Sequence, residues 1–493
     1  MKKPFPFFPP LLAVFPVLSI YASNVQLVSP TQIWRPLVVV VGVTVALWLV
    51  LAAVTRDWMR GAIAATVGIG MCLAYQAFMT ATTLNYYAYI GPMAWAALTL
   101  TLMVVFAWKW RNPAILNVLS VVLLALAGTR VALAFWSESG KPAPVRLTQS
   151  QDSQTLPDVY YFILDGYGRS DVLRKYYDVD NQPFLDSLHD RGFVVANASA
   201  ANFIQTELSL SATLNLNYLQ DLVNPGEYRT RSLFTRLIDQ SEAITTFQEH
   251  GYRFVAVTSG FPPLEFRTAD VRLDDSTGAN LIETYLIQLT PLRSSQSTLD
   301  SLYDDRRRRV MVAFENLRDL ASRTAGPRFI VTHILAPHPP FVFGPNGEPK
   351  RPKGPFGYWD GSDYMTHVGD QASYQTGYAE QVQYLNVLLR ETIDYILANN
   401  RRDAIIILQG DHGPKMHLDQ ADLSKTDIQE SFPILNAILM PKEWRHEYYP
   451  GVSPVNTFRI LFRHLFKMDT ENLPDRHYYS PYDDPLNFTQ VEP

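Results

Sequence analysis

The chain has 493 residues, more than one typical domain, and its hydrophobic residues crowd the first ~135 positions. The net charge of −5 mixes both signs and no nucleic-acid motif is present, so we expect no nucleic-acid partner. The single cysteine, Cys72, excludes an intramolecular disulfide framework, and its apolar surroundings are typical of a small buried hydrophobe. Composition thus indicates a membrane part followed by a soluble part.

Five apolar stretches occupy the first part of the chain, each close to the ~20 residues that a membrane helix needs. They cover residues 5–22, 36–54, 61–79, 93–108 and 113–136. Cations flank alternate loops at Lys2, Lys3, Arg56, Arg60, Lys109 and Arg111, whereas the opposite loops offer only Arg35. Because positive loops stay in the cytoplasm, the amino terminus is expected there, and five crossings put the rest of the chain outside.

These features predict a multi-pass protein of the inner or plasma membrane, integral to the bilayer. Residues 1–136 form the five-helix anchor and residues 137–157, which are polar with Gly, Pro, Ser and Gln, form a linker. Residues 158–493 form an extracytoplasmic catalytic domain.

From residue 158 short apolar runs alternate with amphipathic patterns, which is typical of an α/β fold with a mostly parallel sheet. Strands are expected at 159–164, 193–196, 254–258, 329–334, 405–408 and 434–439, and helices at 183–191, 231–250, 301–322, 374–398 and 454–466. The four arginines 306–309 are interpreted as a solvated helical face, with contact to anionic lipid as the alternative. The long Gly- and Pro-containing loop 341–373 is typical of an active-site lid, with disorder as the alternative.

Two strand ends carry the residue types of a metal site. The run AIIILQGDHGP at 404–414 is a buried strand followed by Asp411 and His412 between glycines, and the strand at 159–164 ends in Asp165 and Gly166. Ligands bind beyond the carboxyl ends of strands in open α/β sheets, so the two ends can converge on one cation. Two carboxylates and an imidazole suit one divalent ion, Mn²⁺, Mg²⁺ or Zn²⁺, with Ca²⁺ as a further candidate.

The segment ANFIQTELSLSATLN at 201–215 begins polar and continues as a helical pattern, which places Thr206 at a helix amino terminus. There a threonine either caps the helix or acts as a nucleophile, because a metal-bound hydroxyl loses its proton more easily and a helix terminus favours an incoming phosphate. Spacing alone does not choose Thr206 over Ser209, Ser211 or Thr213.

The chain resembles the alkaline phosphatase/sulfatase superfamily in a set of short motifs taken together. These motifs are Asp165-Gly166, Gln205-Thr206, His333, His338 to Phe341 and Gly410 to Gly413. Within this superfamily the chain is similar to membrane-anchored sulfatase-like transferases, such as the lipoteichoic acid synthases and lipid A phosphoethanolamine transferases. The resemblance implies metal ligation by Asp165, Thr206, Asp411 and His412, with Thr206 as nucleophile and His338 at the transferred group. It further implies substrate contacts for His333, Asn215 and His477, and for each the alternative is a purely structural role.

Departures from the family narrow the activity. The sulfatase signature for formylglycine is missing, since Glu207, Leu208, Ser209 and Leu210 follow Thr206, and this disfavours sulfate-ester hydrolysis. We therefore expect transfer of a phosphoglycerol- or phosphoethanolamine-type head group from a membrane phospholipid to a glycan or lipid acceptor through a phosphothreonine. The alternatives are a phosphate- or sulfate-ester hydrolase of the same superfamily and a non-enzymatic membrane scaffold.

Overall fold

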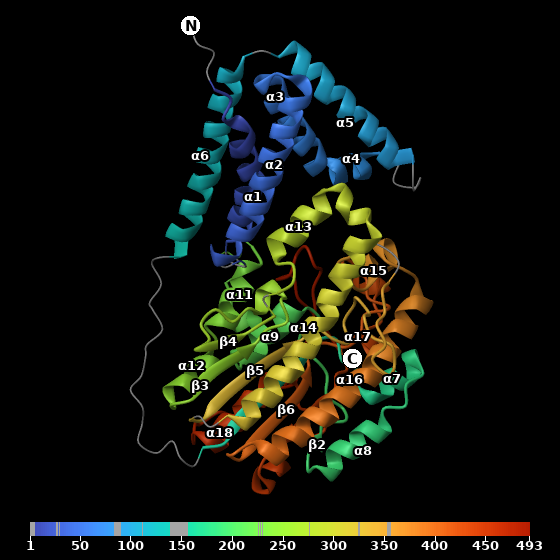
Figure 1. Cartoon of the computed structure of the whole chain (residues 1–493). Coiled ribbons are helices and arrows are strands. Elements are labelled where there is room, and N and C mark those ends of the chain that lie inside the picture. Colours follow the sequence, from blue (N-terminus) through green and yellow to red (C-terminus); the bar gives the residue numbers. More distant parts are fainter. Residues whose placement is uncertain are drawn as a thin grey trace. The chain divides into compact units, whose positions relative to one another are not determined.

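The computed structural model describes residues 5–25, 28, 30–82, 90–110, 112–138, 156–224, 226, 228, 230–275, 277–323, 326–352 and 356–493. Most of the predicted linker lies outside the described residues, as do the flanking cations Lys2, Lys3 and Arg111. The chain divides into two compact units, drawn in Figure 1. The first unit holds Met1–Ala143 and Ala279–Leu299, and the second holds Pro144–Gly278 and Asp300–Pro493.

The first unit is helical. Its amino-terminal helices are α1 (Phe8–Ser23), α2 (Trp34–Thr55), α3 (Trp58–Leu73), α4 (Tyr75–Ala81), α5 (Ile90–Lys109) and α6 (Pro113–Glu138), with the 3-10 turn η1 (Pro30–Gln32) before α2. Among the described residues three helices are long and apolar enough to cross a membrane, or four if the bent pair α3 and α4 is one span. The apolar α1 has only 16 residues, so the predicted five-helix count fits approximately.

The third predicted span, 61–79, is not one straight helix. It breaks at Ala74, and α4 continues at 51° to α3. The apolar pattern runs through both helices, so hydropathy alone does not reveal the bend.

A segment from the middle of the sequence completes this unit. It contains α13 (Leu281–Leu289) and the 3-10 turn η5 (Pro291–Ser294), and a capping box between Asn280 and Glu283 starts α13. The Asn280 side chain donates to the Gln32 carbonyl at 2.9 Å, and Glu283 forms an ion pair with Arg35. The predicted catalytic domain, 158–493, includes this segment, whereas in the structure it belongs to the unit of the anchor.

The second unit is built on a seven-stranded sheet with the order β2-β7-β6-β1-β5-β3-β4. The strands are β1 (Asp158–Leu164), β2 (Val194–Val195), β3 (Arg253–Val257), β4 (Val271–Leu273), β5 (Arg328–Ile334), β6 (Ala404–Gly410) and β7 (Asn436–Leu439). The five strands from β6 to β4 are parallel, and at one edge β7 pairs antiparallel with β6 while β2 pairs antiparallel with β7. This confirms the predicted α/β fold with a mostly parallel sheet.

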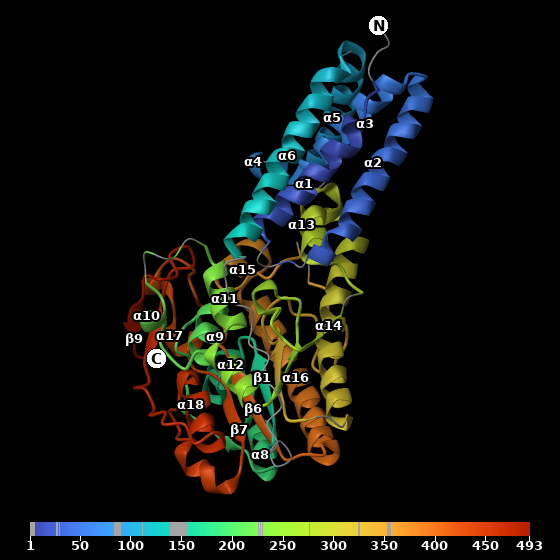
Figure 2. The same cartoon turned by 90° about the vertical axis from the view of Figure 1, so that its left-hand side faces the viewer.

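The sheet is buried on both faces, as the unbroken apolar run of β1 predicts. On one face Val159, Tyr161 and Ile163 join a core with Phe247 of α12 (Glu242–Glu249) and Phe458 of α18 (Pro454–Leu465). The long helices α14 (Gln296–Ser322) and α16 (Gln371–Asn399) cover the opposite face (Figure 2).

The other helices are α7 (Ser170–Tyr177), α8 (Gln182–Asp190), α9 (Thr206–Leu214), α10 (Leu219–Leu222), α11 (Ser232–Asp239), α15 (Ser362–His367) and α17 (Ile428–Ser431), and the short strands β8 (His477–Tyr479) and β9 (Thr489–Val491) pair with each other. The predicted single helix 231–250 is wrong, because α11 ends at Asp239 and α12 begins at Glu242. An irregular segment at Gln240 and Ser241 separates the two helices.

Candidate metal and phosphoryl-transfer site

The central strands bring the predicted metal ligands together. In the sheet β1 lies between β6 and β5, and Leu164 is in register with Gly410 and Ile334. The residues that follow these strands therefore leave the sheet side by side. After β1 the chain turns through Gly166 at φ +74°, a conformation that favours glycine, and the Gly166 N–H donates to Asp411 Oδ1 at 3.0 Å.

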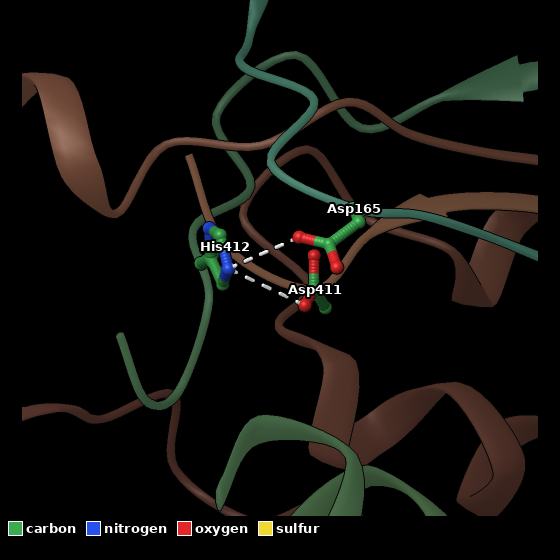
Figure 3. A group of neighbouring side chains, drawn as sticks. All are labelled: Asp165, Asp411 and His412. Carbon is green, nitrogen blue, oxygen red and sulfur yellow. Dashed lines mark ion pairs between the residues drawn. The ribbon is translucent and has the colours of Figure 1, made fainter. Parts of the chain in front are cut away.

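Asp165, Asp411 and His412 form a buried cluster in which one ligand atom from each lies within 4.8 Å of the others (Figure 3). His412 Nε2 is 3.4 Å from Asp165 Oδ1 and 3.5 Å from Asp411 Oδ2. The three side chains come from two neighbouring strand ends, so the sheet holds them in place before any ligand arrives.

The hydrogen-bond partners of His412 indicate that the three side chains face one another with lone pairs. His412 Nδ1 lies 2.8 Å from the Gly413 carbonyl and must carry its proton there, which leaves the Nε2 lone pair directed at the carboxylates. Burial and then the charge of Lys415 hold the pKa of His412 well below its ordinary value, so the ring is neutral. Asp165 Oδ1 and Asp411 Oδ2 have no hydrogen-bond partner among the described residues. Buried acceptors without a donor fit a divalent cation.

His333 positions one of these carboxylates. Its Nε2 lies 3.2 Å from Asp165 Oδ2 and its Nδ1 lies 2.7 Å from Ser259 Oγ. Burial lowers the pKa of His333 to about 3, so the neutral ring accepts from Ser259 and donates to Asp165. Burial and the nearby Asp411 raise the pKa of Asp165 to about 7. His333 thus contacts a predicted metal ligand, Asp165, and its predicted contact with a substrate stays a prediction.

Thr206 is the first residue of α9, and its Oγ1 lies 3.1 Å from His412 Nε2. The competing hydroxyls donate to backbone carbonyls instead: Ser209 to Asp411 at 2.6 Å, Ser211 to Phe234 at 3.3 Å and Thr213 to Ser209 at 2.8 Å. Among the hydroxyls of α9, the Thr206 hydroxyl is therefore the one beside the cluster.

Arg231 holds the residues on both sides of Thr206. Its Nη2 donates to Gln205 Oε1 at 2.6 Å and to Glu207 Oε2 at 3.1 Å, and its guanidinium lies 4.1 Å from the centre of the Tyr482 ring. These contacts fix the entry to α9 and with it the position of the Thr206 hydroxyl.

Two charged residues that sequence reasoning missed lie beside the cluster. Lys415 Nζ is 2.9 Å from His412 Nε2, the nitrogen that a metal ion would take, and Asp360 Oδ2 is 3.4 Å from His338 Nε2. Although burial alone would raise the pKa of Asp360, the charges of His338 and Lys415 bring it below its ordinary value. Lys415 is three residues after His412, and Asp360 lies in the long loop 341–373. Their positions in the sequence, near the motif and in the predicted lid, were the signals that could have identified them.

One ring nitrogen of His338 faces Asp360, and the other contacts a backbone carbonyl. Its Nδ1 is 2.5 Å from the Pro339 carbonyl, so the proton on Nδ1 is held there and Nε2 remains for chemistry. Tyr374 donates to Asp360 Oδ1 at 2.6 Å and fixes the carboxylate that faces this imidazole.

The structure does not bring two predicted substrate contacts to the cluster. Asn215 is the residue that ends α9, at the opposite end from Thr206, where its side chain donates to the Ser211 and Leu237 carbonyls and accepts from the Glu242 N–H. The Asn215 amide thus caps local backbone, and its contact with a substrate stays a prediction. His477 Nδ1 lies 2.9 Å from the Ala201 carbonyl and so supports the segment before α9.

The glycines beside Asp411 and His412 allow neighbouring backbone segments to approach closely. A Cβ at Gly410 would lie 2.5 Å from the Tyr167 carbonyl oxygen, and one at Gly413 would lie 2.5 Å from the Glu430 carbonyl oxygen. Close packing of neighbouring chain segments therefore leaves no room for a side chain at either position.

Comparisons with known proteins give one family match and several solved structures of low sequence identity. A family model described as Sulfatase matches residues 157–464. No curated protein sequence matches the chain. Among solved structures, the integral membrane lipooligosaccharide phosphoethanolamine transferase A from Neisseria meningitidis is 12% identical, with a TM-score of 0.41, covering 91% of this chain and 94% of that one.

Two further solved structures match part of the chain. The C-terminal periplasmic domain of EcEptC from Escherichia coli is 11% identical with a TM-score of 0.45, covering 71% of this chain and 96% of that one. The phosphonate monoester hydrolase of Agrobacterium radiobacter is 13% identical with a TM-score of 0.42, covering 66% of this chain and 80% of that one.

Proposed function

Because the chain belongs to the sulfatase family, whose members act on phosphate or sulfate esters, we propose that it transfers a phosphorylated head group. The group is of the phosphoglycerol or phosphoethanolamine type, the donor is a membrane phospholipid, and the acceptor is a hydroxyl of a glycan or lipid. The observation that carries this proposal is the Thr206 hydroxyl, 3.1 Å from His412 Nε2 at the start of α9. A threonine in that place is a nucleophile for phosphorus, and the sequence after it is not the formylglycine signature of sulfate-ester hydrolases.

Asp165, Asp411 and His412 would hold one divalent ion, with Thr206 as a fourth ligand. When bound, such an ion lowers the pKa of a hydroxyl and neutralises charge on a phosphoryl oxygen. The amino terminus of α9 favours the same negative charge, because its unpaired backbone N–H groups and helix dipole point toward it. His333 keeps Asp165 oriented through its bond to Oδ2.

The transfer takes two in-line steps at phosphorus. Thr206 first loses its hydroxyl proton to solvent. Its Oγ1 then bonds to phosphorus, the bond from phosphorus to the lipid oxygen breaks, and protonated His338 gives its Nε2 proton to that leaving oxygen. In the second step the acceptor oxygen bonds to phosphorus, His338 takes the acceptor proton, and the bond between phosphorus and Thr206 breaks, which regenerates the Thr206 alkoxide for the next cycle.

Asp360 assists His338 in both steps. Its carboxylate lies 3.4 Å from His338 Nε2 and stabilises the imidazolium that must form in each cycle. Tyr374 keeps the carboxylate in this orientation.

The anchor supports a lipid donor. We propose that the amino terminus is cytoplasmic and the catalytic domain extracytoplasmic, as the flanking cations indicate. The ion pair of Arg35 with Glu283 supports this topology, because it ties the start of α2 to a segment that interrupts the catalytic sequence. A phosphatase fused after Pro493 should be active and a fluorescent protein there should be dark, and the reverse pattern would overturn the topology.

Mass spectrometry of Thr206 after incubation with membrane lipids tests the transfer directly. A covalent adduct on Thr206 is expected, and its mass identifies the transferred group. An unmodified Thr206 in protein that still consumes the lipid would remove the phosphothreonine from the mechanism.

Product analysis separates the transferase from a hydrolase that uses the same residues. With an acceptor alcohol present, the head group should appear on the alcohol. Release of free head group alone, at the same rate with and without the alcohol, would assign hydrolysis instead.

A further inference from the structure

One arginine of α14 departs from the solvated face that the sequence predicts. Arg307 and Arg308 are partly exposed and have carboxylate partners, since Arg307 pairs with Asp304 at 2.5 Å and Arg308 pairs with Asp275 at 2.5 Å. Arg306 is instead only 2% exposed. The prediction of a solvated face is therefore wrong for Arg306.

The position of Arg306 on the helix explains its burial. Leu302 and Val310, one turn before and one turn after it, are 5% and 3% exposed and belong to the core-facing stripe of α14. A helix of this kind normally carries an apolar side chain at such a position. Arg306 thus places a cation in the core, where the loss of its hydration is unfavourable unless a specific partner compensates for it.

No described residue supplies that partner. None of the three guanidinium nitrogens of Arg306 has a hydrogen-bond partner, and the nearest aromatic ring, that of Tyr358, has its centre 6.0 Å from Cζ. By contrast, the buried Arg328 donates to Asp158 and to the Leu320 carbonyl. A guanidinium has five N–H donors, and a buried charge without a counter-charge is strongly unfavourable. Among the described residues Arg306 is therefore a buried cation without a counter-charge, which fits an anion supplied by a ligand.

The anion belongs beside the phosphoryl-transfer site. Burial and Tyr358 dominate the pKa of Arg306, which is lowered to about 10, and the next contribution is the charge of Asp165, a proposed metal ligand. Phe261 connects the same surroundings, with its ring centre 5.9 Å from His333 and 6.5 Å from Tyr358.

We propose that the Arg306 guanidinium binds a non-bridging oxygen of the substrate's phosphate ester, as an anion subsite next to the metal cluster. A planar guanidinium matches the geometry of phosphate oxygens with two parallel hydrogen bonds, which a lysine ammonium does not reproduce. The proposed function supplies the identity of the ester, and this inference rests on it to that extent. Binding of inorganic phosphate, however, requires no turnover.

The test measures thermal unfolding of the full chain, as purified in detergent, with increasing inorganic phosphate and with sodium chloride at equal ionic strength. We compare the parent with Arg306→Met, which keeps the size and removes the charge, and with Arg306→Lys. Arg308→Met is the matched control, because Arg308 is on the same helix and pairs with Asp275.

Phosphate should stabilise the parent and Arg308→Met alike. Arg306→Met should bind phosphate about 10- to 100-fold more weakly, the range that charged hydrogen bonds give, and should unfold no earlier than the parent without phosphate. Arg306→Lys should fall between the two.

Parental phosphate affinity in Arg306→Met, an Arg306→Met protein that unfolds well below the parent without phosphate, or equal stabilisation of the parent by chloride would each overturn the proposal. Absence of head-group transfer together with Arg306-dependent phosphate binding would instead refute the proposed function and leave the subsite in place.

Discussion

A buried aspartate lies at each end of β1, and the two differ in whether the chain supplies their hydrogen-bond and ion-pair partners. At the amino-terminal end Asp158 accepts from the Arg328 backbone N–H at 2.9 Å and from its guanidinium at 2.5 Å, and Arg328 also reaches Asn400. At the carboxyl end Asp165 has no cationic side chain paired with it among the described residues, and its Oδ1 has no hydrogen-bond donor. Six residues of one strand separate a satisfied charge from an unsatisfied one.

This difference separates stability from function. A buried carboxylate with its guanidinium and backbone donors is complete within the chain, so its loss should cost folding free energy. A buried carboxylate that faces other lone pairs lowers stability until a cation binds, and the fold tolerates that cost where a ligand is needed. The following predictions test whether the two ends can be changed independently.

The largest effect is expected at Thr206. Thr206→Ala removes the nucleophile and should lower head-group transfer by roughly 10⁴-fold or more, with little change in unfolding, because the hydroxyl contacts only the site. Thr206→Ser keeps a hydroxyl with freer rotamers and should lose about 10- to 1000-fold. Transfer assays with labelled phospholipid measure both.

Ser211→Ala is the control for this series, since its hydroxyl donates to the Phe234 carbonyl away from the cluster. It should retain most of the activity. If Ser211→Ala or Ser209→Ala abolished transfer while Thr206→Ala did not, the nucleophile would have to be reassigned.

At the other end of β1, Arg328→Met should destabilise the catalytic domain by about 3–5 kcal/mol, because it leaves Asp158 buried without its partner. Combining it with Asp158→Leu should recover most of that loss, since an apolar pair of similar volume needs no counter-charge. Chemical denaturation followed by near-ultraviolet circular dichroism measures the free energies. Transfer per folded molecule should stay near the parent value, and a specific loss of activity would show that the two ends are coupled.

The convergence of Asp165, Asp411 and His412 could be predicted from the sequence because apolar runs locate buried strands, and parallel strands end at one edge. The helix α13 was missed although Asn280 and Glu283 have capping-box spacing, since its nine residues are too few for a clear periodicity. Arg306 is one of four consecutive arginines, and only its spacing from Leu302 and Val310 indicates that it faces the core. Lys415 and Asp360 act through side-chain geometry that no spacing encodes.

Asp411→Ala should weaken binding of the divalent ion by at least about 100-fold, because it removes a direct ligand, and outer partners alone are worth 10- to 100-fold. Elemental analysis of purified protein at limiting metal measures the loss. The fold should persist, since Asp411 follows β6 rather than lying within it. Equal metal content in variant and parent would exclude Asp411 as a ligand.

The smallest effect, and the one that reverses sign, is expected for Asp165→Asn. The pKa of Asp165 in the folded metal-free protein is about 7, raised by burial and Asp411 from about 3.9 in an unfolded chain. Between these values the folded state holds a proton that the unfolded state has lost. Its contribution to stability is therefore favourable near pH 4 and is lost as the pH rises toward 7.

Asparagine cannot ionise, yet its oxygen still accepts from His333, so chelator-treated Asp165→Asn should be more stable than the parent at pH 8 by on the order of 2 kcal/mol. The difference should shrink as the pH falls toward 4. With the divalent ion present the order should invert, because the neutral amide is the poorer ligand. Asp158→Asn, at the paired end of the strand, should be less stable than the parent at pH 8 with or without chelator. A destabilised Asp165→Asn in chelator at pH 8 would mean that Asp165, like Asp158, is already satisfied within the chain.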